Sequence, residues 1–363
     1  MNIEELNSEM IEPLVIGGSI LGGGGGGAIA EGLKLGKLAF DVGIPKIINI
    51  NDLNEDDLVV TVSAVGAPAA KNQFVLPMDY VEAIKLTGGM TNKLPKALIT
   101  NENGGLATIN GFFQSAITGI PILDVSCNGR AHPTGVMGSM SLNTVSDYIS
   151  IQAAVGGEPG TEYRISQVLK GNIDSTSKLV RQMSVLAGGF VAVARNPVTK
   201  KYLQTNGAIN AISHAYEVGM AHGSVKNPME KIEKVAEVLN GNVIAEGIVK
   251  DLKFQTTDGF DLGNVVINNK KEDFELTIWN EYITCENSDG KRISTFPDLI
   301  MTFDSDTGMP VTTAELEIGR RLIVIHSDKK NIKLGSGMLL KSNYKAIEDV
   351  LKKDVIKYIE EIF

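Results

Sequence analysis

Cysteine is scarce in this chain of 363 residues, which contains only Cys127 and Cys285. Two cysteines exclude a disulfide-rich scaffold, and neither lies in a CxxC or zinc-finger spacing. Histidine is also rare, with four residues and no HExxH motif. His214 and His222 are eight positions apart, so they cannot chelate one ion from a single unbroken helix. The sequence gives little indication of a metal site, and a divalent ion such as zinc stays only a candidate cofactor.

Long apolar runs are missing as well. The longest are far shorter than the roughly 20 residues that a helix needs to cross a bilayer. The N-terminal segment MNIEELNSEM is acidic and carries no apolar signal-peptide core. We therefore expect a cytoplasmic protein that has no membrane partner.

Positive charge is in the minority. The chain has 34 Lys and Arg residues against 43 Asp and Glu residues, a net charge of −9 at pH 7 and a pI of about 5.1. Such a surface repels phosphate backbones, and no Lys/Arg stripe with interleaved aromatic residues is present. These properties argue against a nucleic-acid partner but leave room for a local basic pocket that binds a small anion. We expect a small-molecule substrate and a homo-oligomeric protein.

The length of the chain and its hydrophobic content of 43% predict two domains. Short apolar runs alternate with helical patterns over residues 1–186, which predicts a glycine-rich α/β domain with a parallel or mixed sheet. Residues 187–340 are mostly strand-like with Asp-Gly turns, which predicts a smaller all-β, barrel-like domain with a helical section at about 209–239. The amphipathic segment 341–363 is a candidate helix to complete the first domain.

Six consecutive glycines, Gly22–Gly27, stand between the apolar segment Leu14–Leu21 and a helical pattern. We interpret the apolar segment as a strand, so that the glycines form a strand-to-helix loop. Glycine is destabilising by roughly 0.5–1 kcal/mol in regular structure, so the loop must require its backbone freedom. One reading is a nest of N–H groups for an anion or a developing oxyanion, formed by Gly23, Gly24, Gly25 and Gly26. The other reading is a tight turn packed against another backbone.

The glycine run is not a nucleotide-binding motif. No Gly-Lys-Ser/Thr follows it, as a P-loop requires, and six glycines match GxGxxG trivially. No acidic strand end stands where a dinucleotide-binding fold would place one. These absences argue against a nucleotide-dependent oxidoreductase or kinase.

A second polar cluster, Glu102 with Asn103, directly follows the predicted strand Ala97–Thr100. Ligands of parallel sheets gather at the carboxyl ends of the strands. Glu102 is therefore a candidate general base or ligand-orienting carboxylate, and Asn103 is a candidate ligand-binding residue. The alternative for Glu102 is an acid that satisfies backbone donors at a helix N-terminus.

A third cluster follows the predicted strand Ile120–Val125 and combines a carboxylate, a thiol, a guanidinium and an imidazole. Asp124, Arg130 and His132 are candidate catalytic residues, because they can act as acid, base and planar anion clamp. Asn128 is a candidate ligand-binding residue. Cys127 is a candidate nucleophile or metal ligand, although a lone cysteine is more often a small buried hydrophobe. Since each cluster follows a strand, we expect them to converge on one pocket with the glycine loop.

Several short segments occur in the order and spacing of one known family. They are Leu21–Gly27, Gly66-Ala67-Pro68, Glu102-Asn103-Gly104-Gly105, Gly119-Ile120-Pro121 leading to Asp124, Gly129-Arg130-Ala131 followed by Pro133, Asn280-Glu281, Pro297-Asp298-Leu299-Ile300, and Thr307-Gly308 with Pro310. Through these segments the chain resembles the S-methyl-thiohydantoin desulfurase family over nearly its whole length. The resemblance implies a glycine-rich α/β domain joined to a small β-barrel-like domain. It also implies hydrolysis of a carbon–sulfur bond at a thiohydantoin ring, which releases a thiol and leaves a hydantoin.

The chain departs from this family pattern at three places. Ser126 and His132 stand where members tend to carry a second acid and an aromatic residue, and Gly138–Leu142 stands where other members can show histidines. Two hypotheses follow. The first is a hydantoinase-like hydrolase of a cyclic imide or thioimidate, acting on a C–S or C–N bond. The alternative is a non-catalytic or regulatory module that binds a small anion.

Overall fold

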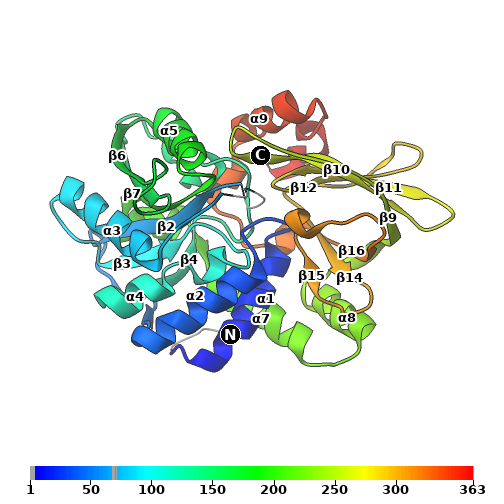
Figure 1. Cartoon of the computed structure of the whole chain (residues 1–363), viewed down its shortest axis with the longest axis horizontal. Helices are drawn as coiled ribbons and strands as arrows, with labels where there is room; N and C mark the ends of the chain where they lie inside the picture. The colour runs from blue at the N-terminus through cyan, green and yellow to red at the C-terminus, as the bar shows by residue number, and fades with distance from the viewer. Residues whose placement is uncertain (1–4, 68–69, 71, 363) are drawn as a thin grey trace.

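A computed structural model describes residues 5–67, 70 and 72–362. Two sheets lie side by side and are joined below by a pair of helices, α1 and α7 (Figure 1). Pro68 of the family landmarks and the outermost residues of the expected domains, Met1 and Phe363, lie outside the described residues. Among the described helices none combines the length and the apolar character that a bilayer crossing requires.

The first sheet is mixed, in the order β1-β4-β3-β2-β7-β5-β6, with β8 on β4. Strands β1 to β4 pair in parallel, whereas β5, β6 and β7 are antiparallel to their neighbours. The strands are β1 (Ile47–Ile48), β2 (Leu58–Gly66), β3 (Ala97–Thr100), β4 (Ile122–Ser126), β5 (Ser150–Gly156), β6 (Ile165–Gly171), β7 (Phe190–Thr199) and β8 (Ala208–Ile209). This arrangement confirms the α/β class with a parallel or mixed sheet.

Helices cover both faces of this sheet. On one face Ile84 of α3 packs against Val62 and Leu98, and on the other Val180 of α5 packs against Val65 and Val193. Full burial of such a side chain stabilises the fold by roughly 1.5–3 kcal/mol. The helices are α1 (Ile11–Leu21), α2 (Ile29–Val42), α3 (Pro77–Thr91), α4 (Phe112–Thr118), α5 (Ile173–Leu186), α6 (Lys200–Asn206), α7 (Ala211–Gly223), α8 (Pro228–Val238) and α9 (Lys341–Leu351).

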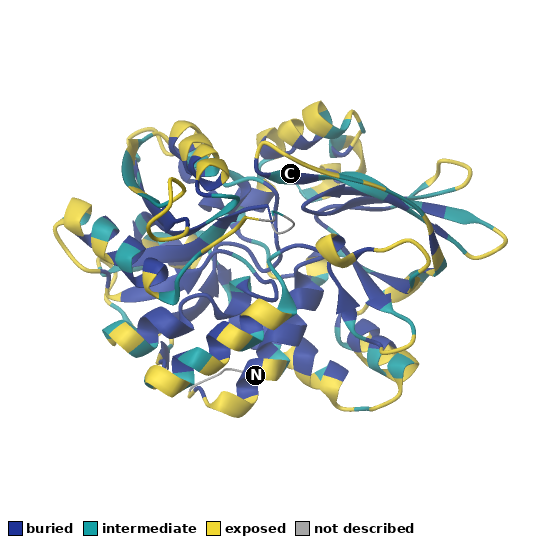
Figure 2. Ribbon diagram, viewed as in Figure 1, coloured by how far each residue is buried: buried dark blue, intermediate teal, exposed yellow. Residues whose placement is uncertain are grey.

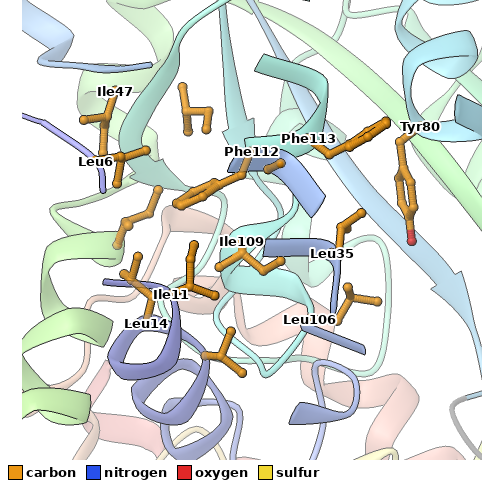
Figure 3. Close-up of a cluster of buried hydrophobic side chains, with 14 of the residues drawn as sticks. Leu6, Ile11, Leu14, Leu35, Ile47, Tyr80, Leu106, Ile109, Phe112 and Phe113 are labelled. Atoms are coloured by element: carbon orange, nitrogen blue, oxygen red, sulfur yellow. The ribbon is translucent and has the colours of Figure 1, made fainter. Parts of the chain in front are cut away.

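The expected strand at Leu14–Leu21 is wrong, because these residues belong to helix α1. A short continuous apolar run fits a helix buried on all sides as well as a buried strand. Every residue from Leu14 to Leu21 is buried, and a Cβ at Gly17 would lie 1.8 Å from the carbonyl oxygen of Ala215 in α7. Side chains of α1, α2 and α4 form a common core with Phe112 at its centre (Figure 3). The glycine run is therefore a helix-to-helix loop.

The second sheet is antiparallel and separate from the first, in the order β13-β12-β11-β10-β9-β16-β14-β15. Turns at Asp258-Gly259 and Asp289-Gly290 connect neighbouring strands, and both glycines have positive φ. Among the described strands, pairing runs in one open order from β13 to β15. The expected separate β-rich unit is therefore present as an antiparallel sheet, without the barrel-like closure that we expected. The strands are β9 (Asn242–Thr257), β10 (Phe260–Asn268), β11 (Asp273–Trp279), β12 (Glu281–Asn287), β13 (Arg292–Thr295), β14 (Leu299–Asp304), β15 (Pro310–Val311) and β16 (Arg321–Ser327).

The change from one sheet to the other falls later in the chain than residue 187. Strand β7 pairs with β2 and β5 and so belongs to the first sheet. Its apolar residues Val191–Ala194 fill the middle of that sheet, where local sequence cannot distinguish a strand of one domain from that of the next. Helices α7 and α8, within the expected helical section at 209–239, lead from the first sheet to the second.

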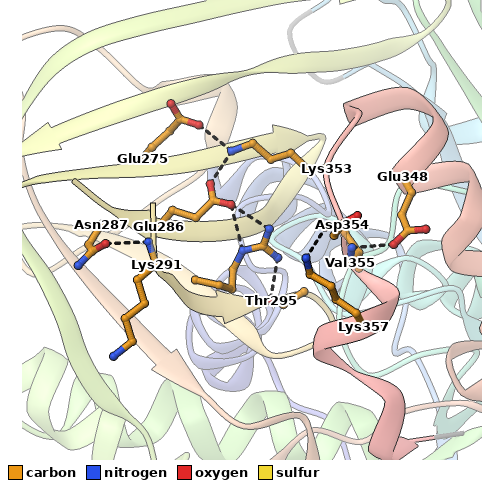
Figure 4. Close-up of polar contacts among 11 residues, drawn as sticks. Glu275, Glu286, Asn287, Lys291, Thr295, Glu348, Lys353, Asp354, Val355 and Lys357 are labelled. Atoms are coloured by element: carbon orange, nitrogen blue, oxygen red, sulfur yellow. Dashed lines mark hydrogen bonds and ion pairs between the residues drawn. The ribbon is translucent and has the colours of Figure 1, made fainter. Parts of the chain in front are cut away.

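The C-terminal segment packs on the second sheet. Tyr344, Ile347 and Val355 contact Trp279 and Phe296, and Met137 reaches the same cluster from the first half of the chain. Lys353 donates to Glu275 (2.7 Å) and also to Glu286 (Figure 4). The segment 341–363 therefore supports the second sheet more than the domain that it was expected to complete. The strands at the middle of the molecule are buried, whereas the outer faces of the helices and the far ends of β9, β10 and β11 are partly or fully exposed (Figure 2).

Candidate functional site

A cavity of about 70 Å³ lies where parallel strands of the first sheet end. It is bordered by the last residues of β2, by the segments that follow β3 and β4, and by the start of β12 from the second sheet. It adjoins a groove of about 670 Å³, with which it shares Gly27, Leu106 and Phe190. The polar residues that line the cavity are Ser63, Asn101, Glu102, Asn110, His132, Thr134, Arg181, Arg195, Asn280 and Glu281.

Glu102 and His132 meet in this cavity. Nδ1 of His132 contacts Oε2 of Glu102, and Asn101 donates from Nδ2 to the same oxygen (3.0 Å). The side chains of His132 and Glu102 are only 2% and 15% exposed. A carboxylate bound to Nδ1 fixes the tautomer and orientation of an imidazole and leaves Nε2 for chemistry. Two of the four residues that we expected to be catalytic are thus brought together.

The room for His132 comes from the glycine at position 138. A Cβ at Gly138 would lie 2.0 Å from Nε2 of His132. Any other residue at this position would have to displace the imidazole. Gly138 and His132 therefore belong to one local packing arrangement.

Arg195 extends the polar chain beyond Asn101. It lies on β7, is 4% exposed, and donates from Nη2 to Oδ1 of Asn101 (2.6 Å). Its Nε has no hydrogen-bond partner among the described residues. Sequence reasoning missed Arg195, although an arginine that directly follows the apolar run Val191–Ala194 of a strand was a usable signal.

Arg181, on α5, is the second arginine of the cavity. Its Nη1 donates to the carbonyl oxygens of Gly66 (2.8 Å) and Gly259 (2.9 Å), and its guanidinium carbon lies 4.3 Å from the ring centre of Phe260. Burial lowers the pKa of Arg181 to about 10, and the charge of Arg195 acts in the same direction. Nothing local in the sequence distinguished Arg181 from the other charged residues of an amphipathic helix.

Glu281 comes to the cavity from the second sheet. It is 2% exposed, and burial, followed by the charge of Glu102, raises the pKa of its carboxyl group well above the usual value, against the opposing effect of Arg130. Oε2 has no hydrogen-bond partner among the described residues. A Cβ at Gly25 would lie 2.2 Å from Oε1, so the carboxyl group rests against the glycine loop. In the sequence Asn280-Glu281 is only a family landmark, and no local pattern marks Glu281 as part of the site.

The glycine loop is hydrogen-bonded to both halves of the molecule. The carbonyl oxygen of Gly23 accepts from the amide of Tyr282 (2.9 Å), and that of Gly24 accepts from Thr313 (3.0 Å). The carbonyl oxygen of Gly26 accepts from Leu106 (3.1 Å) and its neighbour in the first half. These contacts favour the packing interpretation of the loop over an anion nest.

Only part of the loop borders the cavity. Gly26 and Gly27 line it, Gly24 lines the outer groove, and Gly23 lies against the guanidinium of Arg130. A Cβ at Gly26 would lie 2.4 Å from Cα of Gly104. The requirement for glycine is therefore met by backbone-to-backbone packing.

Asp124 is not among the cavity residues. Its carboxylate accepts from the amides of Ile212 (2.8 Å) and Ser213 (3.0 Å) and from the Ser213 hydroxyl (2.5 Å). These are donors of the first turn of α7, so Asp124 stabilises the start of that helix.

The two asparagines of the predicted site also bind backbone. Asn103 donates from Nδ2 to the carbonyl oxygens of Gly129 (3.1 Å) and Ala211 (3.0 Å). Asn128 donates to the carbonyl oxygen of Arg130 (2.8 Å) and accepts from the amide of Gly335 (3.2 Å). Both side chains fix the loops behind the cavity and do not line it.

Arg130 lies in the interface between the halves. It is fully buried, donates from Nη1 to the carbonyl oxygens of Pro297 (3.0 Å) and Asp298, and lies 4.4 Å from the ring centre of Phe296. Nε donates to the carbonyl oxygen of Ala131 (3.3 Å), so the backbone occupies two of the three nitrogens of the guanidinium that we expected to hold a substrate, and Nη2 has no partner among the described residues. Arg130 is thus placed to connect the two sheets.

Cys127 is a buried thiol beside the Thr61 hydroxyl, with Sγ and Oγ1 3.2 Å apart. Burial raises its pKa to about 11, which disfavours a thiolate nucleophile or ligand. Among the described residues no group of three or more His, Cys, Asp or Glu side chains could hold a metal ion. The Glu102–His132 pair alone does not fit a zinc site with three or four protein ligands.

Comparisons with known proteins agree with this architecture. Residues 9–165 match the family model described as "S-Me-THD-like, N-terminal domain", and residues 171–332 match "S-Me-THD-like, C-terminal domain". A crystal structure of a protein from Chromobacterium violaceum superposes with a TM-score of 0.73 at 19% sequence identity, covering 96% of each chain. No curated protein matches the sequence. The likeness to the Chromobacterium protein shows a shared fold.

Proposed function

From the premise that the chain belongs to the S-Me-THD-like family, we propose that it is a hydrolase of a cyclic thioimidate of the S-alkyl-thiohydantoin type. The bond cleaved is the one between ring carbon and sulfur, and the products are a thiol and a hydantoin. The observation that carries the proposal is the buried Glu102–His132 pair at the end of parallel strands. A histidine whose Nδ1 is held by a carboxylate is suited to accept a proton from water at Nε2.

The polar lining of the cavity supports a ring-shaped ligand with several hydrogen-bonding atoms. Five lining residues have a buried side-chain atom without a partner among the described residues, and the five atoms are Ser63 Oγ, Asn110 Nδ2, His132 Nε2, Arg195 Nε and Glu281 Oε2. Leaving a buried polar atom without a hydrogen bond costs about 1–3 kcal/mol. Hydantoin-type rings present carbonyl oxygens and ring nitrogens that would supply the missing partners.

The first step is the addition of water to the ring carbon that carries sulfur. Nε2 of His132 accepts one proton of the water as the new carbon–oxygen bond forms, and Glu102 stabilises the resulting imidazolium through Nδ1. The carbon–nitrogen double bond opens, and its electron pair takes a proton on the ring nitrogen. Glu281 donates that proton, because its raised pKa keeps the carboxyl group protonated where an ordinary glutamate is ionised.

The second step expels the thiol. The carbon–sulfur bond breaks, and the leaving sulfur takes the proton that His132 holds. The hydroxyl group on the ring carbon becomes a carbonyl and returns its proton to the Glu281 carboxylate. Both protons of the water are accounted for, one on sulfur and one, by way of Glu281, on nitrogen. Both side chains regain their starting protonation states.

The test is the release of thiol from an S-methyl-thiohydantoin, followed with a thiol-reactive chromophore. His132→Gln removes the proposed base and should lower kcat/KM by about 10² to 10⁴-fold. His326→Gln is the matched control, because His326 is bonded to Ser294 in the second sheet and does not line the cavity. Equal activity of His132→Gln and the wild type would contradict the assignment. Binding of the ring without thiol release by the wild type would support the non-catalytic binding module instead.

A further inference from the structure

Strand β7 is irregular directly after Arg195. Arg195 pairs with Thr61 of β2, and Val198 pairs with Val59, so two residues of β7 stand opposite one residue of β2 between these pairs. Asn196, the first of the two, is buried and has a φ of +52°, in the left-handed region. Such a β-bulge bends a strand and re-aims a side chain, often next to a functional site. The sheet therefore keeps Arg195 in its direction although regular pairing is lost beside it.

Arg195 points to a neutral side chain. Arg164 and Arg292 each form an ion pair with a carboxylate, at 2.7 Å and 2.8 Å. By contrast, Arg195 is 4% exposed and forms no ion pair with a carboxylate of the described residues. Its Nη2 donates to Oδ1 of Asn101 (2.6 Å). Buried charges are normally paired, so stability alone does not account for an arginine in this place.

The amide of Asn101 has only one orientation that fits its neighbours. A guanidinium only donates hydrogen bonds, so Arg195 requires the amide oxygen on its side. A carboxylate only accepts them, so Nδ2 faces Glu102, where it donates to Oε2 (3.0 Å). The same oxygen contacts Nδ1 of His132. The side chains thus form one chain in the order Arg195, Asn101, Glu102, His132.

The amide in this chain separates two opposite charges. Burial lowers the pKa of Arg195, and the charge of Glu102 is among those that oppose this effect. A guanidinium and a carboxylate that meet directly form a strong, often bidentate pair. Such a pair would draw the carboxylate of Glu102 away from Nδ1 of His132. The Asn101 amide is bonded to both groups and holds the carboxylate on the side of the imidazole.

Position 138 leaves the space that the chain of side chains needs. A Cβ at Gly138 would lie 2.0 Å from Nε2 of His132 and 3.1 Å from Oδ1 of Asn101. The glycine therefore borders the imidazole and the amide at once. A larger residue here would displace both groups that contact Glu102.

We propose that Asn101 and Arg195 are positioning residues for His132. Through Glu102 they hold the proton of the neutral imidazole on Nδ1 and leave Nε2 unprotonated, ready to accept a proton from the attacking water. The inference rests on the proposed function for the role of His132 as the base, whereas the place of the imidazole proton does not depend on turnover. Nε of Arg195 has no partner among the described residues and stays available to a ligand.

Substitutions at Asn101 test the chain in its middle. Asn101→Leu removes both hydrogen bonds at similar volume, and Asn101→Asp keeps the acceptor for Arg195 but sets an oxygen against Glu102. Each should lower kcat for thiol release from S-methyl-thiohydantoin by about 10 to 100-fold, as loss of an orienting partner does, with a smaller change in KM. Asn343→Leu is the matched control, because Asn343 is also 6% exposed and hydrogen-bonded but does not line the cavity.

The variants of Arg195 separate charge from packing. Arg195→Lys keeps a cationic donor for Asn101, and Arg195→Met fills similar space without one. We expect the lysine variant to retain more of the wild-type kcat than the methionine variant. Equal losses in the two variants would contradict a role that depends on donation to Asn101.

The tautomer of His132 is read by ¹⁵N NMR of protein labelled at histidine, at the alkaline end of a titration where the ring is neutral. The chain has four histidines, so the signals of His132 are identified by their loss in His132→Gln. The wild type should carry the proton on Nδ1. In Asn101→Leu and Asn101→Asp the proton should be shared with Nε2, whereas Asn343→Leu should keep the wild-type signals.

The outcomes distinguish this proposal from the hydrolase. A wild-type ring protonated on Nε2, or Asn101 variants that keep the wild-type tautomer, would overturn the positioning role, and the first of these needs no variant to fold. Thiol release with an unchanged kcat in both Asn101 variants overturns the positioning role alone. An Nδ1 tautomer that these variants lose, without thiol release by the wild type, supports the positioning role and overturns the hydrolase.

Discussion

The glycine loop and the strand-end cavity lie against one another, but they differ in how far their polar groups are hydrogen-bonded. In the loop, carbonyl oxygens of Gly23, Gly24 and Gly26 accept bonds from both halves of the molecule. In the cavity, side chains such as His132 and Arg195 keep polar atoms without partners among the described residues. A region with satisfied groups and tight backbone contact is built for stability. A region that leaves buried polar atoms unpaired bears a cost that a ligand can remove.

Because of this difference, we expect substitutions in the loop and substitutions in the cavity to change different measured quantities. A change in the loop disturbs backbone packing between the halves and should act on the free energy of unfolding. A change in the cavity removes a group that faces the ligand and should act on kcat/KM. Glu281 touches both regions, so it should respond in both measurements.

The largest effect is expected for Gly26→Ala. The new Cβ would lie 2.4 Å from Cα of Gly104, and φ at Gly26 is +78°, which L-residues rarely adopt. We expect a loss of at least about 3 kcal/mol in the free energy of unfolding, as for other severe packing conflicts. Chemical denaturation measures this loss.

Gly89→Ala is the control for that substitution. Gly89 lies in α3, and a Cβ there meets nothing within 4 Å. Alanine should be neutral or stabilise this helix by up to about 1 kcal/mol. Similar stabilities of the two variants would show that backbone contact is not the reason for glycine in the loop.

Glu281→Gln tests the connection between the two regions through pH. Because burial raises the folded-state pKa of Glu281, its protonated form contributes stability that is fully present below the unfolded pKa of about 4.3. This contribution is lost as the pH rises through the folded pKa, at about 1.4 kcal/mol for each unit between the two values. The glutamine variant cannot ionise, so its unfolding free energy should lack this decline. Its kcat/KM should fall by about 10²-fold, because the proposed proton donor is gone.

The same pKa predicts the pH profile of the wild type. Activity should fall as the pH rises through the raised pKa of Glu281, since only the protonated group donates to the ring nitrogen. Unfolding curves and kcat/KM measured between pH 4 and pH 9 provide both readouts. Parallel pH dependence of stability in the wild type and the variant would exclude Glu281 as the responsible group.

The smallest effect is expected for Asp124→Asn. Asp124 caps α7 behind the cavity, and asparagine keeps an acceptor oxygen for the amides of Ile212 and Ser213. We expect a loss of about 1 kcal/mol in stability and no more than a few-fold change in kcat/KM. A loss of activity as large as that of His132→Gln would show that Asp124 takes part in the reaction and does not only cap α7.

The amino-acid sequence by itself determined the family, the mixed α/β class, the antiparallel second half and the location of Glu102 and His132 after strands. These features follow from local signals, because strand periodicity, Asp-Gly turns and the order of short motifs depend only on residues that are near one another in the sequence.

Tertiary structure decided that Leu14–Leu21 is a helix and that β7 belongs to the first sheet, since an apolar run takes its conformation from the surfaces that bury it. It also decided which polar groups remain without partners. Glu281 and Glu102 are 179 positions apart in the chain and line one cavity, and no local pattern predicts that they come together. Packing of the two sheets brings both carboxyl groups to one cavity, where burial raises the pKa of Glu281.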